Sequence, residues 1–311
     1  MNILITGAAG FIGSALAKHL QNFGNFIYTI DNLSTGSLDN IPDGVEYLIA
    51  DCSDSSIYEN LKKYNFDVVI HLAGQSSGEI SFDNPINDIK SNTLSTILLL
   101  DFCKTNNIER FIYASTMSVY GEPVERGVSE SSKIQPKSFY AVGKYASEQY
   151  LNIYKKFNIS STALRLFNVY GPGQNLLNLK QGMVSIYLSQ LLNSNDVLVK
   201  GTLDRSRDFI YIDDVIKSFS RVIENQSTFG KIINIGSGKE TSVKTLLNLL
   251  EKVSKKKINI LQESSTPGDI NNIYSDNTLM MTTLFSDSEN LVTLEEGLSK
   301  MWNQEIKNEF I

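Results

Sequence analysis

The N-terminal half of the chain alternates short strand-like runs with segments whose apolar residues recur at helical spacing. NILIT at residues 2–6 and FIYTID at residues 26–31 have the composition of short strands, and FIGSALAKHL between them has the helical spacing. These three segments predict one βαβ unit. Further strands are predicted at VEYLIA, DVVIHLAG and RFIYAS, with helical segments near residues 56–64 and 87–106. A parallel sheet covered by helices is therefore expected.

The pattern becomes less regular after Gly171. A GPGQN turn leads into helical segments at residues 181–192 and 241–257, whereas FIYIDDV (209–215) and KIINIG (231–236) still have the character of sheet strands. The predicted fold class is α/β, a doubly wound parallel Rossmann-type sheet with a second, smaller domain. The predicted boundaries are residues 1–169 for the first domain, with 208–238 returning to it, and residues 170–207 with 239–311 for the second.

The composition is that of an ordinary globular protein. A chain of 311 residues with 41% hydrophobic content can build one large or two moderate domains. Its net charge of −6 provides no basic field for nucleic acid or anionic lipid. The longest apolar stretches are far shorter than the roughly 20 residues that span a bilayer. Because no signal-peptide pattern precedes the first strand, we expect a cytoplasmic protein with no nucleic-acid and no membrane partner.

Cysteine and histidine are scarce. Cys52 and Cys103 are too few for a disulfide framework, and His19 and His71 cannot form a histidine-rich metal site. We therefore expect metal-free chemistry. His71 stands at the end of a predicted strand, where a local hydrogen bond is the expected role.

TGAAGFIG places Gly7, Gly10 and Gly13 between the first strand and the first helix. Glycines there permit a tight turn and close approach to a pyrophosphate, whose charge meets the amides of the helix N-terminus. The spacing is GxxGxxG, and packing alone can also produce such a turn. Asp31 ends the second strand, where its carboxylate would bind a ribose diol and repel a 2′-phosphate, which favours NAD over NADP. The alternative for Asp31 is a solvated turn residue.

Other predicted cofactor contacts lie at strand ends on the same side of the sheet. Asp51 and Cys52 follow the third strand, where an adenine edge could be met, and Leu72, Ala73 and Gly74 end the fourth strand. The set is completed by Phe11, Ile12, Asn32, Ser34 and Gly36.

STMSVYG and YAVGK carry the candidate chemistry. Thr116 ends the fifth strand and should face the cofactor crevice, while Tyr140 and Lys144 are four residues apart on a predicted helix and share one face. A nearby ammonium would lower the pKa of the phenol, so Tyr140 could take a proton from a substrate hydroxyl held by Thr116. Such a Tyr/Lys pair also occurs on many helices for packing, but its combination with the dinucleotide turn favours catalysis.

A family resemblance follows from these motifs. TGAAGFIGS, DNLSTG, HLAG, STMSVYG, YAVGK, LRLFNVYGPGQ and RDFIYIDDV resemble, in order, the extended short-chain dehydrogenase/reductases that modify nucleotide sugars. DNLSTG and SVYG are most similar to the UDP-glucose 4-epimerase branch. The resemblance covers nearly the whole chain. It implies an NAD-binding Rossmann domain, a nucleotide-sugar-binding domain, and a site in which Tyr140 is the base, Lys144 its activator and Thr116 the hydroxyl partner.

The same resemblance implies further site residues. Asn92 would help to order the site, Phe167 and Asn168 would contact nicotinamide and sugar nucleotide, and Arg207 would pair with the substrate diphosphate. Ser76 and Asp269 complete the implied substrate contacts. Members of this family commonly form dimers through the helix after SNTLS and the helix that bears Tyr140, which implies a homodimer.

Two departures from the family bear on the reaction and its substrate. Related 4,6-dehydratases and decarboxylases carry an acid just after the catalytic hydroxyl, where this chain has Met117 and Ser118. Oxidation at C4 of a nucleotide-diphosphate sugar is therefore expected to dominate. The family's RPGD is TPGD here, so Thr266 brings no charge, and substrate anchoring must rest on Arg207 or another cation. Ile273 takes the place of an aromatic gate found in some epimerases, which is compatible with a bulkier sugar.

Three functions agree with these observations. The first is a 4-epimerase, in which a transient 4-keto intermediate is reduced again on its other face. The second is a net C4 dehydrogenase that releases the 4-keto sugar and leaves NADH. The third is a non-catalytic NAD-binding sensor, which would not need Thr116, Tyr140 and Lys144 together.

Overall fold

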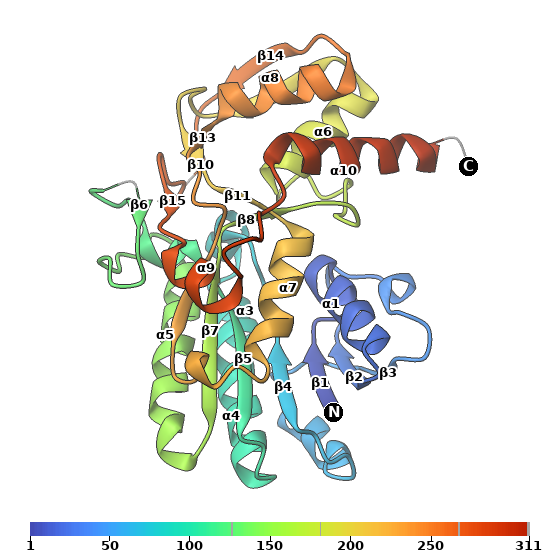
Figure 1. The fold of residues 1–311 in the computed structure, drawn as a ribbon, viewed down its shortest axis with the longest axis vertical. Coiled ribbons are helices and arrows are strands. Elements are labelled where there is room, and N and C mark those ends of the chain that lie inside the picture. The colour runs from blue at the N-terminus through green and yellow to red at the C-terminus, as the bar shows by residue number, and fades with distance from the viewer. Residues whose placement is uncertain (126, 181, 267, 310–311) are drawn as a thin grey trace.

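A seven-stranded parallel sheet forms the lower part of the molecule in Figure 1. The computed structural model describes residues 1–125, 127–180, 182–266 and 268–309. The strand order is β12-β7-β5-β4-β1-β2-β3, and every pairing between neighbours is parallel. The strands are β1 (Asn2–Thr6), β2 (Phe26–Asp31), β3 (Glu46–Ile49), β4 (Val68–His71), β5 (Arg110–Thr116), β7 (Ser160–Leu166) and β12 (Ile232–Ile235).

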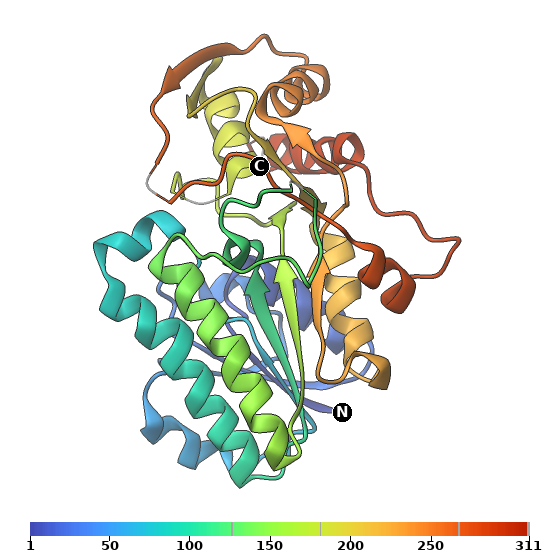
Figure 2. The same cartoon turned by 90° about the vertical axis from the view of Figure 1, so that its left-hand side faces the viewer.

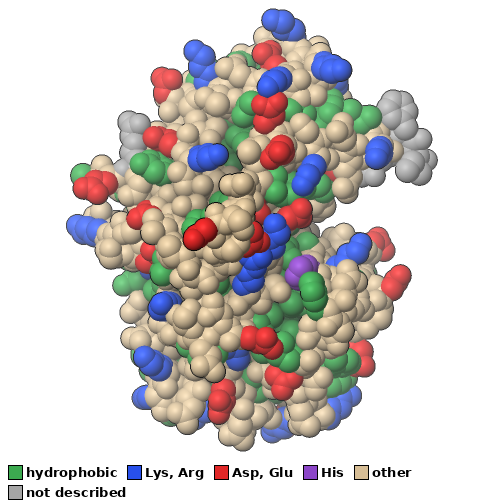
Figure 3. All heavy atoms as spheres, in the orientation of Figure 1, with side chains coloured by type: hydrophobic (Ala, Val, Ile, Leu, Met, Phe, Trp, Pro, Cys, Tyr) green, Lys and Arg blue, Asp and Glu red, His purple; other side chains and the backbone are tan. Residues whose placement is uncertain are grey.

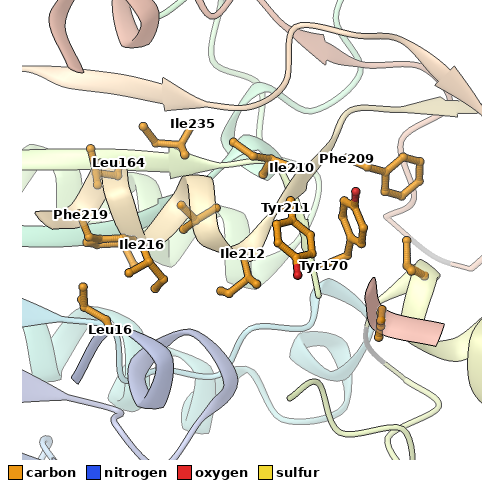
Figure 4. Packing of buried hydrophobic residues seen from close by; sticks show 14 of the residues in the cluster. Leu16, Leu164, Tyr170, Phe209, Ile210, Tyr211, Ile212, Ile216, Phe219 and Ile235 are labelled. Carbon is orange, nitrogen blue, oxygen red and sulfur yellow. The ribbon is translucent and has the colours of Figure 1, made fainter. Parts of the chain in front are cut away.

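Helices cover both faces of this sheet, and Figure 2 shows α4 and α5 side by side on one of them. The long helices of the two faces are α1 (Phe11–Asn22), α7 (Ile212–Val222), α4 (Ser95–Thr105) and α5 (Phe139–Tyr154). Ile3 and Ile5 of β1 belong to the core with α1 and α7, whereas Leu4 belongs to the core with α4 and α5. Successive side chains of a strand point to opposite faces, so one strand supplies both cores. Figure 4 shows Leu16 of α1 facing Ile216 of α7 in the first core. The predicted α/β, doubly wound Rossmann-type sheet is confirmed.

A second group of elements lies above the carboxyl ends of the sheet strands in Figure 1. Its helices are α6 (Met183–Asn193), α8 (Val243–Ser254) and α10 (Leu294–Glu309). Its two-stranded sheets pair β9 (Asp196–Lys200) with β14 (Asn259–Glu263), β10 (Ser206–Arg207) with β13 (Thr241–Ser242), β8 (Asn168–Tyr170) with β11 (Phe209–Tyr211), and β6 (Gly127–Val128) with β15 (Tyr274–Ser275). A cleft between this group and the sheet would therefore lie at the strand ends, where ligands bind in open α/β sheets.

Short helical elements lie between the longer ones. They are α2 (Gly78–Asp83), α3 (Pro85–Asp88), a π-helical turn at Ile89–Leu94, α9 (Thr278–Leu284), and 3₁₀ segments at Leu38–Asn40, Ser55–Leu61, Met117–Tyr120, Lys155–Phe157 and Gln226–Thr228. The helix expected near residues 87–106 is thus divided, because the π-helical turn separates α3 from α4.

The prediction of one strand at FIYIDDV is wrong in its second half. Only Phe209–Tyr211 is a strand, and it pairs with β8 in a small sheet instead of joining the main one. Ile212 begins α7, which has Asp213 and Asp214 in its first turn, where carboxylates suit the helix N-terminus. KIINIG does supply β12, which pairs with β7 in the main sheet. The domain boundaries themselves stay a prediction.

Acidic and basic side chains are interspersed on the face drawn in Figure 3. In the ranges that the structure describes, no helix is both long and apolar enough to pass through a membrane.

Candidate active site

The glycine-rich turn packs so closely that side chains are excluded from it. Gly7 has a φ of +81°, and a Cβ there would lie 2.7 Å from the backbone nitrogen of Ala73 at the end of β4. A Cβ on Gly13 would lie 2.1 Å from the carbonyl oxygen of Gly7. Gly10 is the N-cap of α1 and supplies no capping side chain. The first amides of the helix are therefore available to an anion, as a pyrophosphate site requires.

Asp31 joins this turn to the end of β2. Its Oδ2 accepts a hydrogen bond from the N–H of Ala9 at 2.9 Å, and its Oδ1 accepts one from the N–H of Leu33 at 2.8 Å. The carboxylate is buried, which argues against a solvated turn residue. Each oxygen keeps a further acceptor site, so contact with a ribose diol is still available. Gly36 closes the turn from the other side, since a Cβ there would lie 2.5 Å from the carbonyl oxygen of Ala9.

The other predicted cofactor residues line the same strand ends. Asn32 donates from Nδ2 to Oδ2 of Asp51 at 3.2 Å, and its Oδ1 accepts the N–H of Ser34 at 3.1 Å. Cys52 is buried, and burial raises the pKa of its thiol. Phe11 and Ile12 form the first turn of α1, and Leu72 follows β4.

His71 is held by local hydrogen bonds at the end of β4. Its Nδ1 lies 2.7 Å from Oγ1 of Thr6, and its Nε2 lies 3.2 Å from Oγ of Ser95. Burial, followed by the charge of Lys144, lowers its pKa well below the ordinary value. These contacts agree with the local role expected for this histidine.

Thr116 and Tyr140 meet at the end of β5. Thr116 is the last residue of that strand, and its Oγ1 accepts the N–H of Ser118 at 3.1 Å as the cap of the following 3₁₀ segment. Tyr140 lies in the first turn of α5, whose N-cap Ser138 accepts the N–H of Ala141 at 3.2 Å. Burial raises the pKa of the Tyr140 phenol, and the neighbouring Thr116 side chain acts in the opposite direction. The structure therefore brings together the two hydroxyls that the sequence assigns to the reacting oxygen.

Lys144 is buried one turn further along α5. Its Nζ donates to the carbonyl oxygen of Ala114 at 3.0 Å and lies 6.0 Å from the ring centroid of Tyr140. Burial lowers the pKa of Lys144 to about 8, although the Asp88 carboxylate acts in the opposite direction. Burial also raises the pKa of Tyr140 to about 12, Thr116 acts in the opposite direction, and the Asp88 carboxylate raises the pKa further. The lowered pKa expected for Tyr140 is thus not found, because loss of solvent and the charge of Asp88 outweigh the effect of Thr116.

Asn92 is buried beside this group in the π-helical turn. Its Nδ2 donates to the carbonyl oxygen of Gln75 at 2.9 Å and to Oδ1 of Asp88 at 3.1 Å. A Cβ on Gly74 would lie 2.4 Å from Oδ1 of Asn92 and 3.5 Å from Nζ of Lys144, so the amide and the ammonium approach one another across that glycine. The sequence interpretation missed Asp88, although its position four residues before Asn92 was a usable signal.

Asp88 is a buried carboxylate with an incomplete set of partners. Its Oδ1 accepts hydrogen bonds from Nε2 of Gln75 at 3.0 Å and from Asn92. Its Oδ2 has no partner within the described residues, and it lies 3.3 Å from the position that a Cβ on Gly143 would take. Burial raises the pKa of Asp88, and Lys144 opposes that rise. The charge of Asp88 therefore acts on the catalytic helix.

The predicted substrate residues line the second part of the molecule. Asn168 donates from Nδ2 to the carbonyl oxygen of Asp208 at 3.0 Å and to Sδ of Met117 at 3.6 Å. Phe167 and Ile273 are buried in one apolar cluster. Ser76 lies exposed in the loop before α2.

Asp269 is held between two arginines. Its Oδ1 lies 2.5 Å from Nη2 of Arg207, and its Oδ2 pairs with Nη1 of Arg205. Arg205 directly precedes β10, so it reaches the same carboxylate as Arg207 two residues later.

The sequence of this chain matches one family over most of its length. Residues 3–236 match the NAD dependent epimerase/dehydratase family. The chain belongs to this family. The predicted membership is thereby confirmed.

Known members of the epimerase/dehydratase family resemble the chain over its whole length. The chain is 32% identical over 308 residues to a putative UDP-glucose 4-epimerase of Methanocaldococcus jannaschii, with 97% of each covered. Its structure matches the UDP-glucose 4-epimerase of Thermotoga maritima with UDP-glucose at a TM-score of 0.94 and 30% identity, covering 99% of this chain and 100% of that one. It also matches the structure of the UDP-glucuronic acid 4-epimerase of Bacillus cereus in complex with UDP-glucuronic acid and NAD. The TM-score is 0.89 and the sequence identity 30%, and the match covers 99% of this chain and 100% of that one.

The chain is therefore an enzyme of the NAD-dependent nucleotide-sugar epimerase/dehydratase family, and NAD is its cofactor. The turn formed by Gly7 and Gly13 fits a dinucleotide, since Cβ atoms there would collide with the backbone of Ala73 and of Gly7 and open the tight turn before the helix N-terminus. When bound, NAD supplies two-electron oxidation and reduction of the substrate carbon. The groups that the chain places at this strand end are the phenol of Tyr140, the hydroxyl of Thr116 and the buried amine of Lys144.

Proposed function

We propose that the chain is a nucleotide-sugar 4-epimerase. The observation that carries this proposal is the set of groups beside Thr116. Met117 and Ser118 occupy the positions after it, and the Ser118 hydroxyl accepts a hydrogen bond from Thr116 Oγ1 at 3.2 Å. Neither side chain is an acid that could protonate a leaving hydroxyl at a second carbon. The chemistry is therefore confined to C4.

The carboxylate nearest to this strand end on α5 is already committed. Oε1 of Glu148 accepts hydrogen bonds from Ser115 at 2.6 Å and from Nε of Arg165 at 2.9 Å. Its Oε2 accepts Nη2 of Arg165 at 2.7 Å, and the pair is fully buried. Both oxygens of Glu148 are engaged by Ser115 and Arg165, so neither is placed to serve as an acid for dehydration.

The protein residues would move one proton out and back. Thr116 donates a hydrogen bond to the O4 oxygen, and Tyr140 takes the O4 proton as C4 is oxidised to the ketone. Lys144 stabilises the phenolate of Tyr140 that accepts this proton and that forms again when the proton is returned. After the sugar turns over in the site, Tyr140 returns the proton to O4 as C4 is reduced on its other face. The products are the C4 epimer and the unchanged enzyme, so electrons and protons balance.

The substrate class that we propose is a nucleotide-diphosphate hexose. The relatives from Thermotoga maritima and Bacillus cereus, which hold UDP-glucose and UDP-glucuronic acid, support a uridine nucleotide. Ile273 is fully buried in the apolar cluster with Phe167, so the proposal gives it no contact with the sugar. The roles given to Ser76, Asn168 and Arg207 belong to this proposal.

We also propose a homodimer formed through α5 and the neighbouring helices. α5 packs against the π-helical turn and α4, as Figure 2 shows. Phe139, Val142 and Ile153 lie along its outer face and are 45%, 53% and 49% exposed. Ile86 and Ile89 add to this apolar surface from α3 and the π-helical turn. Light scattering should give a dimer for the wild type and a monomer after Val142→Glu, whereas a monomeric wild type would reject the proposal.

The function is tested by incubation with a panel of UDP-, GDP-, CDP- and dTDP-hexoses. NMR should show conversion between the two C4 epimers of one substrate, with no lasting absorbance of NADH. Tyr140→Phe is the control that should abolish the conversion. Release of a keto sugar with accumulation of NADH would identify a dehydrogenase instead, and no change in any sugar would leave only the NAD-binding sensor.

A further inference from the structure

A carboxylate and an amine are buried close to one another behind the end of β5. Asp88 is fully buried as the last residue of α3, and Lys144 is 5% exposed on α5. Nζ of Lys144 donates to the carbonyl oxygen of Ala114 at 3.0 Å, whereas Oδ2 of Asp88 has no hydrogen-bond partner among the described residues. A buried charge with so few partners is costly unless a charge of opposite sign acts on it.

Gly143 allows α3 to approach α5 at this point. It lies inside α5, where glycine is less favourable than alanine by roughly 1 kcal/mol. A Cβ on Gly143 would lie 3.2 Å from Oγ1 of Thr93 and 3.3 Å from Oδ2 of Asp88, so a side chain would press on both groups. The glycine therefore brings the Asp88 carboxylate against the helix, one residue before Lys144.

Asn92 connects the two charged groups. Both hydrogens of its amide are used, because Nδ2 donates to the carbonyl oxygen of Gln75 at 2.9 Å and to Oδ1 of Asp88 at 3.1 Å. Its Oδ1 points the other way, toward Gly74, and has no partner in the described part of the chain. Nζ of Lys144 lies 3.5 Å from the position that a Cβ on Gly74 would take. The amide thus turns its positive end to the carboxylate and its negative end to the lysine.

Further bonds fix Asp88 in this arrangement. Its Oδ1 also accepts Nε2 of Gln75 at 3.0 Å, and its carbonyl oxygen accepts the hydroxyl of Ser91 at 3.3 Å. These bonds hold the carboxylate where α3 meets the π-helical turn, and such turns are frequent at functional sites. The charge of Asp88 favours the protonated form of Lys144, and the charge of Lys144 favours the ionised form of Asp88.

We propose that Asp88 is a positioning residue, which holds the Asn92 carbonyl oxygen toward Lys144 and supplies the negative charge that keeps this lysine protonated. The inference rests on the proposed function, because there the charge of Lys144 stabilises the phenolate of Tyr140. Without Asp88, burial would act on the lysine unopposed and favour its neutral form. Asp88 thus acts on the reaction through Asn92 and Lys144.

Other titratable groups also face this lysine. Tyr140 lies on the same helix, and the ring centroid of Tyr113 on β5 lies 4.8 Å from Nζ. Burial raises the pKa of the Tyr113 phenol, so this ring stays neutral. His71 on β4 stays neutral as well, because burial and the charge of Lys144 lower its pKa well below the ordinary value. The negative charge that acts on Lys144 is therefore assigned to Asp88, which also faces Tyr140.

The test measures the protonation of Lys144 directly, by NMR titration of the NAD-bound protein labelled at the ε-carbon of lysine. The signal of Lys144 is the one that Lys144→Met lacks. In the wild type its midpoint should lie below the ordinary range of lysine, because of burial. Asp88→Asn should lower the midpoint further, by about 1 pH unit. Asp83→Asn is the matched control, since it removes the same charge from an exposed position on α2 and should leave the midpoint unchanged.

An unchanged midpoint in Asp88→Asn would overturn the inference, because a residue that acts only through its hydrogen bonds leaves the charge of Lys144 as it is. An equal fall of the midpoint in Asp83→Asn would overturn it too, since the effect would then be one of net charge. If Asp88→Asn does not fold, Asp88→Ser removes the same charge with a smaller side chain and should give the same fall.

The titration needs no sugar nucleotide, which separates the inference from the function on which it rests. A wild type that converts no sugar, with a Lys144 midpoint that still depends on Asp88, would reject the proposed function and support the link between the two residues. A wild type that converts a sugar, with the same midpoint in Asp88→Asn, would reject the inference alone.

Discussion

Ser115 donates a hydrogen bond to Oε1 of Glu148 at 2.6 Å, and this bond ties the end of β5 to the middle of α5. Thr116 and Tyr140 lie on the two elements that it joins. Arg165 of β7 holds the same carboxylate at 2.9 and 2.7 Å and donates to Oη of Tyr120 at 2.9 Å. The relative placement of Thr116 and Tyr140 is therefore supported by a buried ionic network beside them.

Glu148→Gln should strongly destabilise the fold, because it leaves the Arg165 guanidinium buried without its counter-charge. The expected loss is about 3–5 kcal/mol of unfolding free energy, measured by urea denaturation. Glu59→Gln is the control, since Glu59 pairs with Lys62 at 2.7 Å on the surface. That variant should change the free energy by less than about 1 kcal/mol. Equal losses of unfolding free energy in the two variants would contradict the view that burial makes the Glu148–Arg165 pair important for stability.

The glycine-rich turn gives a second stability prediction. Gly13→Ala should destabilise the protein by about 1–3 kcal/mol or more and reduce NAD binding, because its Cβ would lie 2.1 Å from the carbonyl oxygen of Gly7. Gly10→Ala is the comparison, since its φ of −87° suits alanine and its Cβ would lie 3.3 Å from the same oxygen. Its effect on unfolding should be within about 1 kcal/mol. Thermal unfolding with and without NAD measures both changes.

Several of these features could be predicted from the sequence, because they are local. The βαβ unit follows from the apolar spacing around Gly7, and the shared face of Tyr140 and Lys144 follows from their separation by four residues. The start of α7 at Ile212 could not be read from FIYIDDV, where the apolar pattern fits a strand as well as a helix. The pairing of Arg205 with Asp269 joins residues far apart in the chain, and no local pattern reports such a contact.

Asp31 predicts the choice of cofactor. The wild type should bind NAD more tightly than NADP, because a 2′-phosphate would meet the Asp31 carboxylate. Asp31→Asn should reduce this difference in affinity. It should also weaken the binding of NAD itself, since Oδ2 of Asp31 accepts the hydrogen bond from the N–H of Ala9 in the glycine-rich turn. Calorimetric titration with both dinucleotides measures the ratio, and equal affinities in the wild type would contradict this role of Asp31.

Asp88 predicts a pH dependence. The groups facing Lys144 are Tyr140 on its own helix, Asp88 on α3, His71 on β4 and Tyr113 on β5. Lys144 has a pKa of about 8, so the rate should fall above about pH 8 as its proton is lost. The carboxylate of Asp88 raises the pKa of both Lys144 and Tyr140.

Asp88→Asn should therefore shift the whole pH profile of kcat to lower pH, because both pKa values fall when the negative charge is removed. Its amide keeps an oxygen that can accept the hydrogen bond from Asn92, so the packing is largely preserved. A profile measured from pH 6 to 9 distinguishes this effect from a structural one. An equal loss of kcat at every pH, with the shape of the pH profile unchanged, would show that Asp88 only positions Asn92.

Tyr140→Phe is the decisive change at the reacting oxygen. It keeps the ring and its packing in α5 but deletes the group that takes the proton, so turnover should fall by roughly 10²- to 10⁴-fold. Thr116→Val removes the proposed hydroxyl partner while keeping the shape of the side chain, and should lower turnover less, because Ser118 Oγ lies 3.2 Å from Thr116 Oγ1 and can supply a hydroxyl. Tyr150→Phe, further along the same helix, is the control and should keep wild-type turnover. The measurement is single-turnover formation of NADH with the preferred sugar nucleotide, with NAD affinity measured in parallel. If Tyr140→Phe oxidised its substrate at the wild-type rate, Thr116, Tyr140 and Lys144 would not form one catalytic site.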